Sequence, residues 1–80
     1  MNDEAHPKIY LYRRIVAAKL YIDEHYTERI QVQDMAKEAC FSKYHFLRLF
    51  KKAYGQTPHA YLTSLRIKRA KDLLLEDSSI

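Results

Sequence analysis

The sequence is poor in the residues that bend and cross-link a chain. Its 80 residues include one Gly, two Pro, one Cys and no Trp. The shortage of Gly and Pro argues against hairpins and tight β-turns and favours helices joined by short links. A single Cys cannot form an internal disulfide, and the acidic N-terminus lacks the basic start and apolar run of a secretory signal. We therefore expect an all-α protein in a reducing, cytoplasmic setting.

Several function classes lack their sequence signals. No apolar run approaches the roughly 20 residues that span a bilayer, so we expect no membrane partner. There is no Gly-rich phosphate loop and no pair of carboxylates at catalytic positions, so we expect no enzyme. A structural metal needs a Cys/His set, whereas the four histidines are scattered, and we expect no metal and no cofactor. They are His6, His25, His45 and His59.

Acidic residues are absent from residues 41–71, although the rest of the chain uses them freely. This segment carries a net charge of +8, within a formal total of +4. Its basic residues are Lys43, Arg48, Lys51, Lys52, Arg66, Lys68, Arg69 and Lys71. Such a block indicates a polyanionic partner.

The spacing of apolar residues predicts about four helices in a single domain. Apolar residues recur every three or four positions along the segments that we expect to be helical: 9–26, 32–39, 43–54 and 58–76. Residues 1–8 are polar and broken by Pro7, so we expect a disordered tail before a domain of residues 9–80. The inner face expected for the last helix is Tyr61, Leu62, Leu65, Ala70, Leu73 and Leu74.

Local signals bound the third helix and the start of the fourth. Ser42 is a good N-cap, and Gly55 stands where a helix commonly ends in a left-handed residue. Thr57 is a second N-cap, followed by Pro58 at a first helical position, where its missing amide costs nothing. Cys40 is expected to be a half-buried turn residue before the third helix.

A short turn between two helices, the second with a basic outer face, is the helix-turn-helix layout. The inner stripe of the second helix would be Phe46, Leu49, Phe50 and Ala53. Its length of about 18 Å suits the major groove of DNA. The layout therefore predicts a recognition helix over residues 43–54.

The outer face of this helix supplies the candidate DNA contacts. Arg48 can fork onto guanine, Tyr44 can stack or touch a thymine methyl, and Leu47 can offer an apolar contact. We expect these three to contact bases. The expected phosphate contacts are Ser42, Lys43, His45, Lys51, Lys52 and Thr57. The alternative for each lysine is a solvated side chain. For Arg66 we expect a structural pair with an acid of the first or second helix, and the alternative is a phosphate contact.

Residues 30–75 resemble the DNA-binding region of the AraC/XylS family of bacterial transcription regulators. The resemblance rests on Ala36, Phe41-Ser42, Phe46-Leu47-Arg48-Leu49-Phe50-Lys51-Lys52, Gly55-Gln56-Thr57-Pro58, Tyr61-Leu62, Arg66, Ala70 and Leu73-Leu74. It implies a domain of two helix-turn-helix units joined by a linker helix, with recognition helices in successive major grooves. Tyr44, Leu47 and Arg48 match family positions that contact bases, although family members often carry a polar residue where this chain has Leu47.

The resemblance also implies how the chain is organised. The fourth helix is similar to the family's linker, and the second unit would start at about residue 79. We therefore expect a homeodomain-like half of a two-unit DNA-binding domain, which binds double-stranded DNA in a sequence-specific way. Family regulators also recruit RNA polymerase. The rival expectation is a helical interaction module, in which the leucine-rich end of helix 58–76 docks a partner or a second copy.

Overall fold

A computed structural model describes the backbone of residues 7–78 and the side chains of residues 9–76. The helices along it are α1 (Pro7–His25), α2 (Val32–Glu38), α3 (Lys43–Tyr54) and α4 (Pro58–Ser78). Residues 7–78 contain no strand, which confirms the predicted all-α class.

The helix boundaries agree closely with those expected. The bounds of α3 are those predicted, α2 ends one residue early because Ala39 is its C-cap, and α4 continues to Ser78. The expected tail of residues 1–8 is wrong at its last two residues, since α1 begins at Pro7. Proline is favoured at a first helical position, because its fixed φ angle suits the helix and its missing amide has no helical partner there. Residues 1–6 lie outside the described part of the chain.

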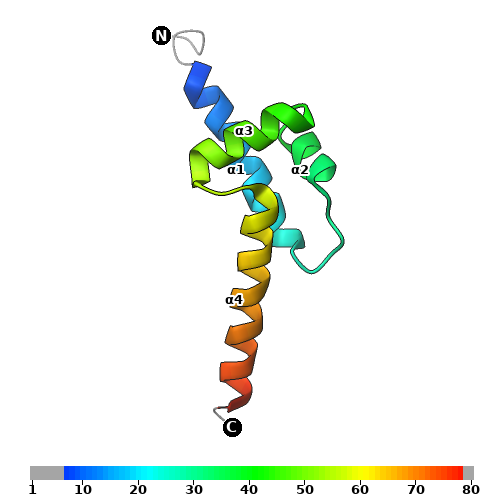
Figure 1. The fold of residues 1–80 in the computed structure, drawn as a ribbon, viewed down its shortest axis with the longest axis vertical. Coiled ribbons are helices and arrows are strands. Elements are labelled where there is room, and N and C mark those ends of the chain that lie inside the picture. The colour runs from blue at the N-terminus through cyan, green and yellow to red at the C-terminus, as the bar shows by residue number, and fades with distance from the viewer. Residues whose placement is uncertain (1–6, 79–80) are drawn as a thin grey trace.

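Three helices form a body from which the fourth projects (Figure 1). In the picture α3 crosses over α1, α2 packs to one side of both, and α4 runs away from them as a single rod. The principal extents of 55 × 26 × 19 Å record this elongated shape. The start of α4 is therefore the part that belongs to the body.

The core is built from apolar side chains at helical spacing on each element. Ile15, Ala18 and Ile22 repeat at threes and fours along α1 and are buried. The remaining buried apolar residues come from α2, α3 and the first turns of α4: Met35, Ala36, Ala39, Phe46, Phe50 and Leu62. Every one of these helices turns its apolar stripe inward.

Phe50 stands at the centre of an aromatic group in this core. Its ring centroid lies 5.6 Å from that of Phe46, 4.7 Å from Tyr54 and 5.9 Å from Tyr61. Tilted and edge-on pairs at these distances add to the stabilisation given by apolar burial. Because Tyr61 belongs to α4, the group joins the recognition helix to the start of the projecting helix.

The inner face expected for α4 is only partly correct. Leu62 is buried, and Tyr61 and Leu65 pack against the core. Ala70, Leu73 and Leu74 were also expected to face inward, but they are exposed. The reason is that α4 runs past the core (Figure 1), where Ala70 and Leu73 line an open hollow beside Tyr26 and Thr27 instead of being covered.

The turn between α2 and α3 is closed by two backbone hydrogen bonds. The amide of Phe41 donates to the carbonyl of Ala36 and the amide of Cys40 to that of Lys37, both at 3.0 Å. This pattern is the Schellman motif, whose left-handed position usually holds glycine. Here it holds Cys40, with φ of 58°. Cys40 is exposed, so its expected half-burial is wrong.

The strained φ at Cys40 leads to a stability prediction. Cys40→Gly should stabilise the fold by about 0.5–1 kcal/mol, because glycine adopts a left-handed conformation freely and this gain exceeds its entropy loss on folding. Cys40→Val should destabilise it by about 1–2 kcal/mol, since a β-branched residue tolerates positive φ poorly. Urea unfolding measures both free energies. Equal stabilities of the two variants would contradict a left-handed backbone at residue 40.

A polar group also ties α1 to α4. The hydroxyl of Tyr61 donates to one carboxylate oxygen of Asp23 at 2.5 Å, and the ammonium of Lys19 lies 2.9 Å from the other. Burial, followed by the bond to Asp23, raises the pKa of the Tyr61 hydroxyl. The pKa of Lys19 is raised chiefly by its hydrogen bond to Asp23. The start of α4 is thus fixed by a directional contact as well as by packing.

Tyr61→Phe tests this contact. It should lower the free energy of unfolding by about 1–2 kcal/mol near neutral pH, because it removes a hydrogen bond to a charged acceptor. Since the pKa is raised in the folded state, Tyr61 contributes stability below its unfolded pKa of about 10, and that stability is lost as pH rises through the folded pKa. The variant should therefore lose less stability than the natural chain in this alkaline window, as urea unfolding at several pH values would measure.

Tyr10→Phe is the matched control. Tyr10 lies on α1 and is 55% exposed, so its substitution should leave the free energy of unfolding nearly unchanged. If Tyr61→Phe were as mild as Tyr10→Phe, the hydrogen bond to Asp23 would contribute nothing to stability.

Candidate nucleic-acid interface

The helix α3 is bounded at both ends as its local sequence dictates. The Oγ of Ser42 accepts a hydrogen bond from the amide of His45 at 3.3 Å, which makes Ser42 the N-cap. Gly55 ends the helix in the left-handed conformation, with φ of 76°, and its amide donates a hydrogen bond to the carbonyl of Lys51. Since glycine adopts this conformation freely, α3 has a defined length and cannot run on into α4.

The two sides of α3 differ sharply in exposure. Phe46 and Phe50 are fully buried, whereas Tyr44 is 72% exposed and Arg48 is also exposed. The inward stripe is completed by Leu49 and Ala53, which pack against the core. The predicted orientation of α3 is therefore confirmed, and its basic side faces outward.

Tyr44 and Arg48 lie next to each other on this outward face. They stand one helical turn apart, and the guanidinium carbon of Arg48 is 6.0 Å from the centroid of the Tyr44 ring. This distance is at the limit of a cation–π contact. The contact favours an arrangement in which the planar fork of Arg48 lies beside the tyrosine and points away from the body.

Leu47 departs from the expectation for the outer face. It was placed among the outward residues, but its side chain is half-buried. Its apolar edge remains partly accessible beside Tyr44 and Arg48, so the three expected base-contacting residues do lie on adjacent positions of one helix.

The four basic side chains of α3 are all exposed, and the helix contains no acidic residue. They are Lys43, Arg48, Lys51 and Lys52. Positive charges along one face at this density attract an anionic polymer, because they repel one another and are compensated by its phosphates.

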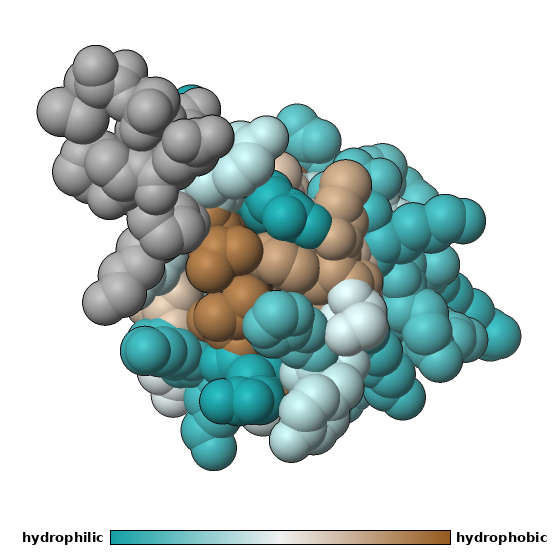
Figure 2. Space-filling view, turned by 90° about the horizontal axis from the view of Figure 1, so that it is seen from above, coloured by the Kyte–Doolittle hydropathy of each residue, from teal (hydrophilic) through white to brown (hydrophobic). Residues whose placement is uncertain are grey.

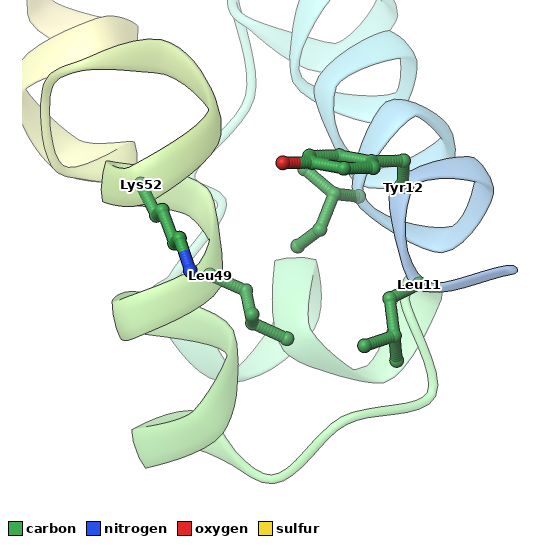
Figure 3. A pocket seen from close by; sticks show the side chains of 5 residues that line it. Leu11, Tyr12, Leu49 and Lys52 are labelled. Carbon is green, nitrogen blue, oxygen red and sulfur yellow. The ribbon is translucent and has the colours of Figure 1, made fainter. Parts of the chain in front are cut away.

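Lys52 lies toward one edge of this face, where α3 meets α1. Together with Leu11, Tyr12, Ile15 and Leu49 it lines a hollow of about 180 Å³. Figure 3 shows Leu11 and Leu49 pointing into it, with the Tyr12 hydroxyl directed toward α3. Seen from above, the molecule shows an apolar area ringed by hydrophilic residues (Figure 2). The side chain of Lys52 can therefore cover apolar surface with its stem while its charge stays in water.

The other expected phosphate contacts lie at helix starts. Thr57 is the N-cap of α4, with its Oγ1 accepting from the amide of Ala60 at 3.1 Å, as Ser42 accepts from His45. Each hydroxyl keeps its hydrogen for another acceptor. His45 is exposed, and its ring centroid lies 5.5 Å from that of Phe41.

Arg66 has a structural role, with partners that differ from those expected. Its Nε donates to the carbonyl of Tyr26 and its Nη2 to that of Glu28, both at 2.8 Å. The sequence suggested a carboxylate partner, but the end of a helix offers unpaired carbonyls that an arginine fork can reach. Arg66 thereby fastens α4 to the segment that follows α1.

One residue near the site was missed by sequence reasoning. Arg14 on α1 donates its Nε to the carbonyl of Ala39 at 2.9 Å and its Nη2 to that of Cys40. The sequence does mark Arg14 by its spacing. It follows Leu11 by three residues and precedes Ala18 by four, which places it on the same side of the helix as the buried stripe. An arginine on such a stripe indicates a buried acceptor nearby.

Two further findings concern the described residues. They include no group of three or more His, Cys, Asp or Glu side chains that could hold a metal ion. None of the helices within them combines the length and apolar character that a membrane crossing requires.

These features define a helix-turn-helix protein with a basic recognition helix. Residues 22–63, more than half of the chain, match the family model described as bacterial regulatory helix-turn-helix proteins, AraC family. The chain belongs to this family and is a DNA-binding module of a transcription regulator. No solved structure matches the chain.

Several regulators share this module. An uncharacterized HTH-type transcriptional regulator of Bacillus subtilis, YbfI, is 43% identical over 54 residues, which are 68% of this chain and 20% of the relative. The lactose operon transcription activator of Staphylococcus xylosus is 37% identical over 60 residues, 75% of this chain and 22% of the relative. The bifunctional transcriptional activator/DNA repair enzyme AdaA of B. subtilis is 36% identical over 56 residues, 70% of this chain and 26% of the relative. The chain spans about a quarter or less of the length of these relatives.

Proposed function

We propose that α3 enters the major groove of double-stranded DNA and reads its sequence. The observation that carries this proposal is the orientation of α3, which buries Phe46 and Phe50 and turns Tyr44 and Arg48 outward. The face is about as long as a major-groove contact requires and carries no carboxylate that would repel phosphates.

Each side chain on this face has a distinct role in the proposal. Arg48 forms two hydrogen bonds with a guanine edge, while Tyr44 and the accessible edge of Leu47 contact apolar atoms such as a thymine methyl. The phosphate contacts are made by Ser42, Lys43, His45, Lys51, Lys52 and Thr57, which fix the position of α3 on the duplex without reading bases. Ser42 and Thr57 donate their hydroxyl hydrogens while their oxygens cap helices.

Within the whole protein, this module directs a bacterial cytoplasmic regulator to its promoters. Two of the relatives are named as activators, which favours activation and, with it, a contact to RNA polymerase. In this proposal α4 acts as the linker to a second helix-turn-helix unit, because its far half leaves the body and exposes apolar residues.

A second candidate function follows from that same part of α4. Leu73 is 62% exposed and Leu75 is 69% exposed, beyond the last contact of the helix with the core. Exposed apolar residues of this kind mark interaction sites in soluble proteins. The helix would then dock a partner or a second copy of the chain, and this docking can accompany DNA binding.

Salt dependence tests the proposed function. A single unit that neutralises a few phosphates should bind a random-sequence duplex with a dissociation constant of about 10⁻⁴ to 10⁻⁶ M near physiological salt. The logarithm of the association constant should fall with the logarithm of the salt concentration, with a slope of about −3 to −4. Fluorescence anisotropy with a labelled duplex measures both, and selection from a randomised duplex library supplies the preferred sequence. Absent or salt-insensitive binding to the duplex would contradict DNA recognition by the basic face of α3.

Two single variants separate base reading from phosphate contact. Arg48→Ala should cost about 1–3 kcal/mol on the selected duplex and relax the preference at one base pair. Lys51→Ala, one turn further along the same face, should weaken binding to all duplexes alike and make the salt slope shallower by about one. Equal effects of the two variants on selected and scrambled duplexes would contradict these roles.

A further inference from the structure

The guanidinium of Arg14 holds the turn that leads into the recognition helix. The Schellman motif uses the carbonyls of Ala36 and Lys37 as acceptors, which leaves the carbonyls of Ala39 and Cys40 without helical partners. Arg14, which lies 25 residues before Ala39, reaches both of these carbonyls from α1. A single side chain therefore fastens the end of α2 to a different helix.

The same guanidinium also lies over the next residue of the turn. Its carbon is 4.1 Å from the centroid of the Phe41 ring, well within cation–π range. Phe41 directly precedes Ser42, the N-cap of α3, and its ring packs beside that of His45 in the first turn of α3. Arg14 thus contacts three consecutive residues immediately before the N-cap of the helix that carries the DNA face.

This contact lies at the backbone turn from which α3 starts. The turn contains Cys40 in a left-handed conformation that a non-glycine residue rarely adopts, so it needs support from its surroundings. A rotation of about 10° at the turn would move the far end of a helix about 18 Å long by about 3 Å. Hydrogen bonds to base edges require much closer placement than this, whereas flexible lysines can follow a displaced phosphate.

We propose that Arg14 is a positioning residue for sequence recognition, which sets the angle of α3 through Ala39, Cys40 and Phe41 without touching DNA. This inference rests on the proposed function of α3. Loss of the Arg14 guanidinium should reduce the preference for one DNA sequence over another and leave the electrostatic part of DNA binding intact. Lysine should not replace it, because lysine lacks the planar fork that reaches two carbonyls and stacks on a ring.

The test measures the ratio of affinities for the library-selected duplex and a scrambled duplex, over a series of salt concentrations. Arg14→Met and Arg14→Lys should each lower the ratio by about fivefold or more, or bring it to one where the starting preference is smaller. The scrambled-duplex affinity and the salt slope should not change. Circular dichroism confirms that each variant is folded at the temperature of measurement. Arg13→Met is the matched control, since Arg13 is the exposed neighbour on α1, and it should leave the ratio unchanged.

Three outcomes would overturn the inference. If the Arg14 variants lower the unfolding midpoint but leave the ratio unchanged, the role of Arg14 is purely structural. If Arg14→Lys restores binding and Arg14→Met makes the salt slope shallower by about one, Arg14 contacts a phosphate. If Arg48→Ala leaves the ratio unchanged, the proposed function fails together with this inference, whereas a response to Arg48→Ala without one to Arg14→Met removes this inference alone.

Phe41→Leu provides a second route should Arg14→Met prove unfolded. Leucine keeps an apolar side chain at the turn but removes the aromatic face under the guanidinium. The ratio should fall in the same direction by a smaller amount, with the salt slope unchanged. An unaltered ratio in folded Phe41→Leu, together with an unaltered ratio in Arg14→Lys, would overturn the proposal.

Discussion

The burial of Phe46 and Phe50 is the constraint on which the rest of the molecule depends. Both rings are fully enclosed, and each contributes about 1.5–3 kcal/mol by leaving water. They are the largest fully buried side chains of the described residues, in a chain of 80 residues that forms only a small core. Because a helix repeats every 3.6 residues, the burial of positions 46 and 50 leaves positions 44, 48 and 51 on the opposite side. The outward direction of the basic side chains is therefore a consequence of the packing of two phenylalanines.

The rest of the body serves to hold α3 at both of its ends. At its start, the Schellman turn and Arg14 join α2 and α1 to the residue before the N-cap. At its end, Gly55 reverses the chain, and the contact of Tyr61 with Asp23 fixes the start of α4 on α1. Thus α1, which carries none of the expected DNA contacts, reaches both ends of the recognition helix. A small protein gains a rigid reading surface in this way, because each end of the surface is attached to the longest helix of the body.

The sequence predicted those features that depend on neighbouring residues. The bounds of α3 followed from Ser42, Gly55 and the apolar period, all of which act within a few residues, and the structure agrees with them. The partners of Arg14 and Arg66 lie 25 to 40 residues away in the chain, and no local pattern names them. Periodicity also failed for the far half of α4. It identifies which side of a helix is apolar, but whether another element covers that side depends on the packing of the whole chain. The half-burial of Leu47 has the same cause, since its exposure depends on neighbours from other helices.

The structural role of Arg66 changes how the basic block of residues 41–71 should be interpreted. Its net charge of +8 suggests a broad surface for phosphates, but the donors of Arg66 are directed at the carbonyls of Tyr26 and Glu28. Three more of the charges lie farther along α4: the guanidinium carbon of Arg69 is 5.8 Å from the centroid of the Tyr26 ring, and Lys68 and Lys71 are exposed. The charges that share the outward side of the molecule with Tyr44 are the four on α3. A count of four agrees with the shallow salt slope expected for one unit, and a slope of about −6 would require the charges of α4 to contact the DNA as well. Arginine serves both purposes in this chain because its fork pairs with carbonyl oxygens as readily as with phosphates, so that charge alone does not distinguish a clamp from a contact.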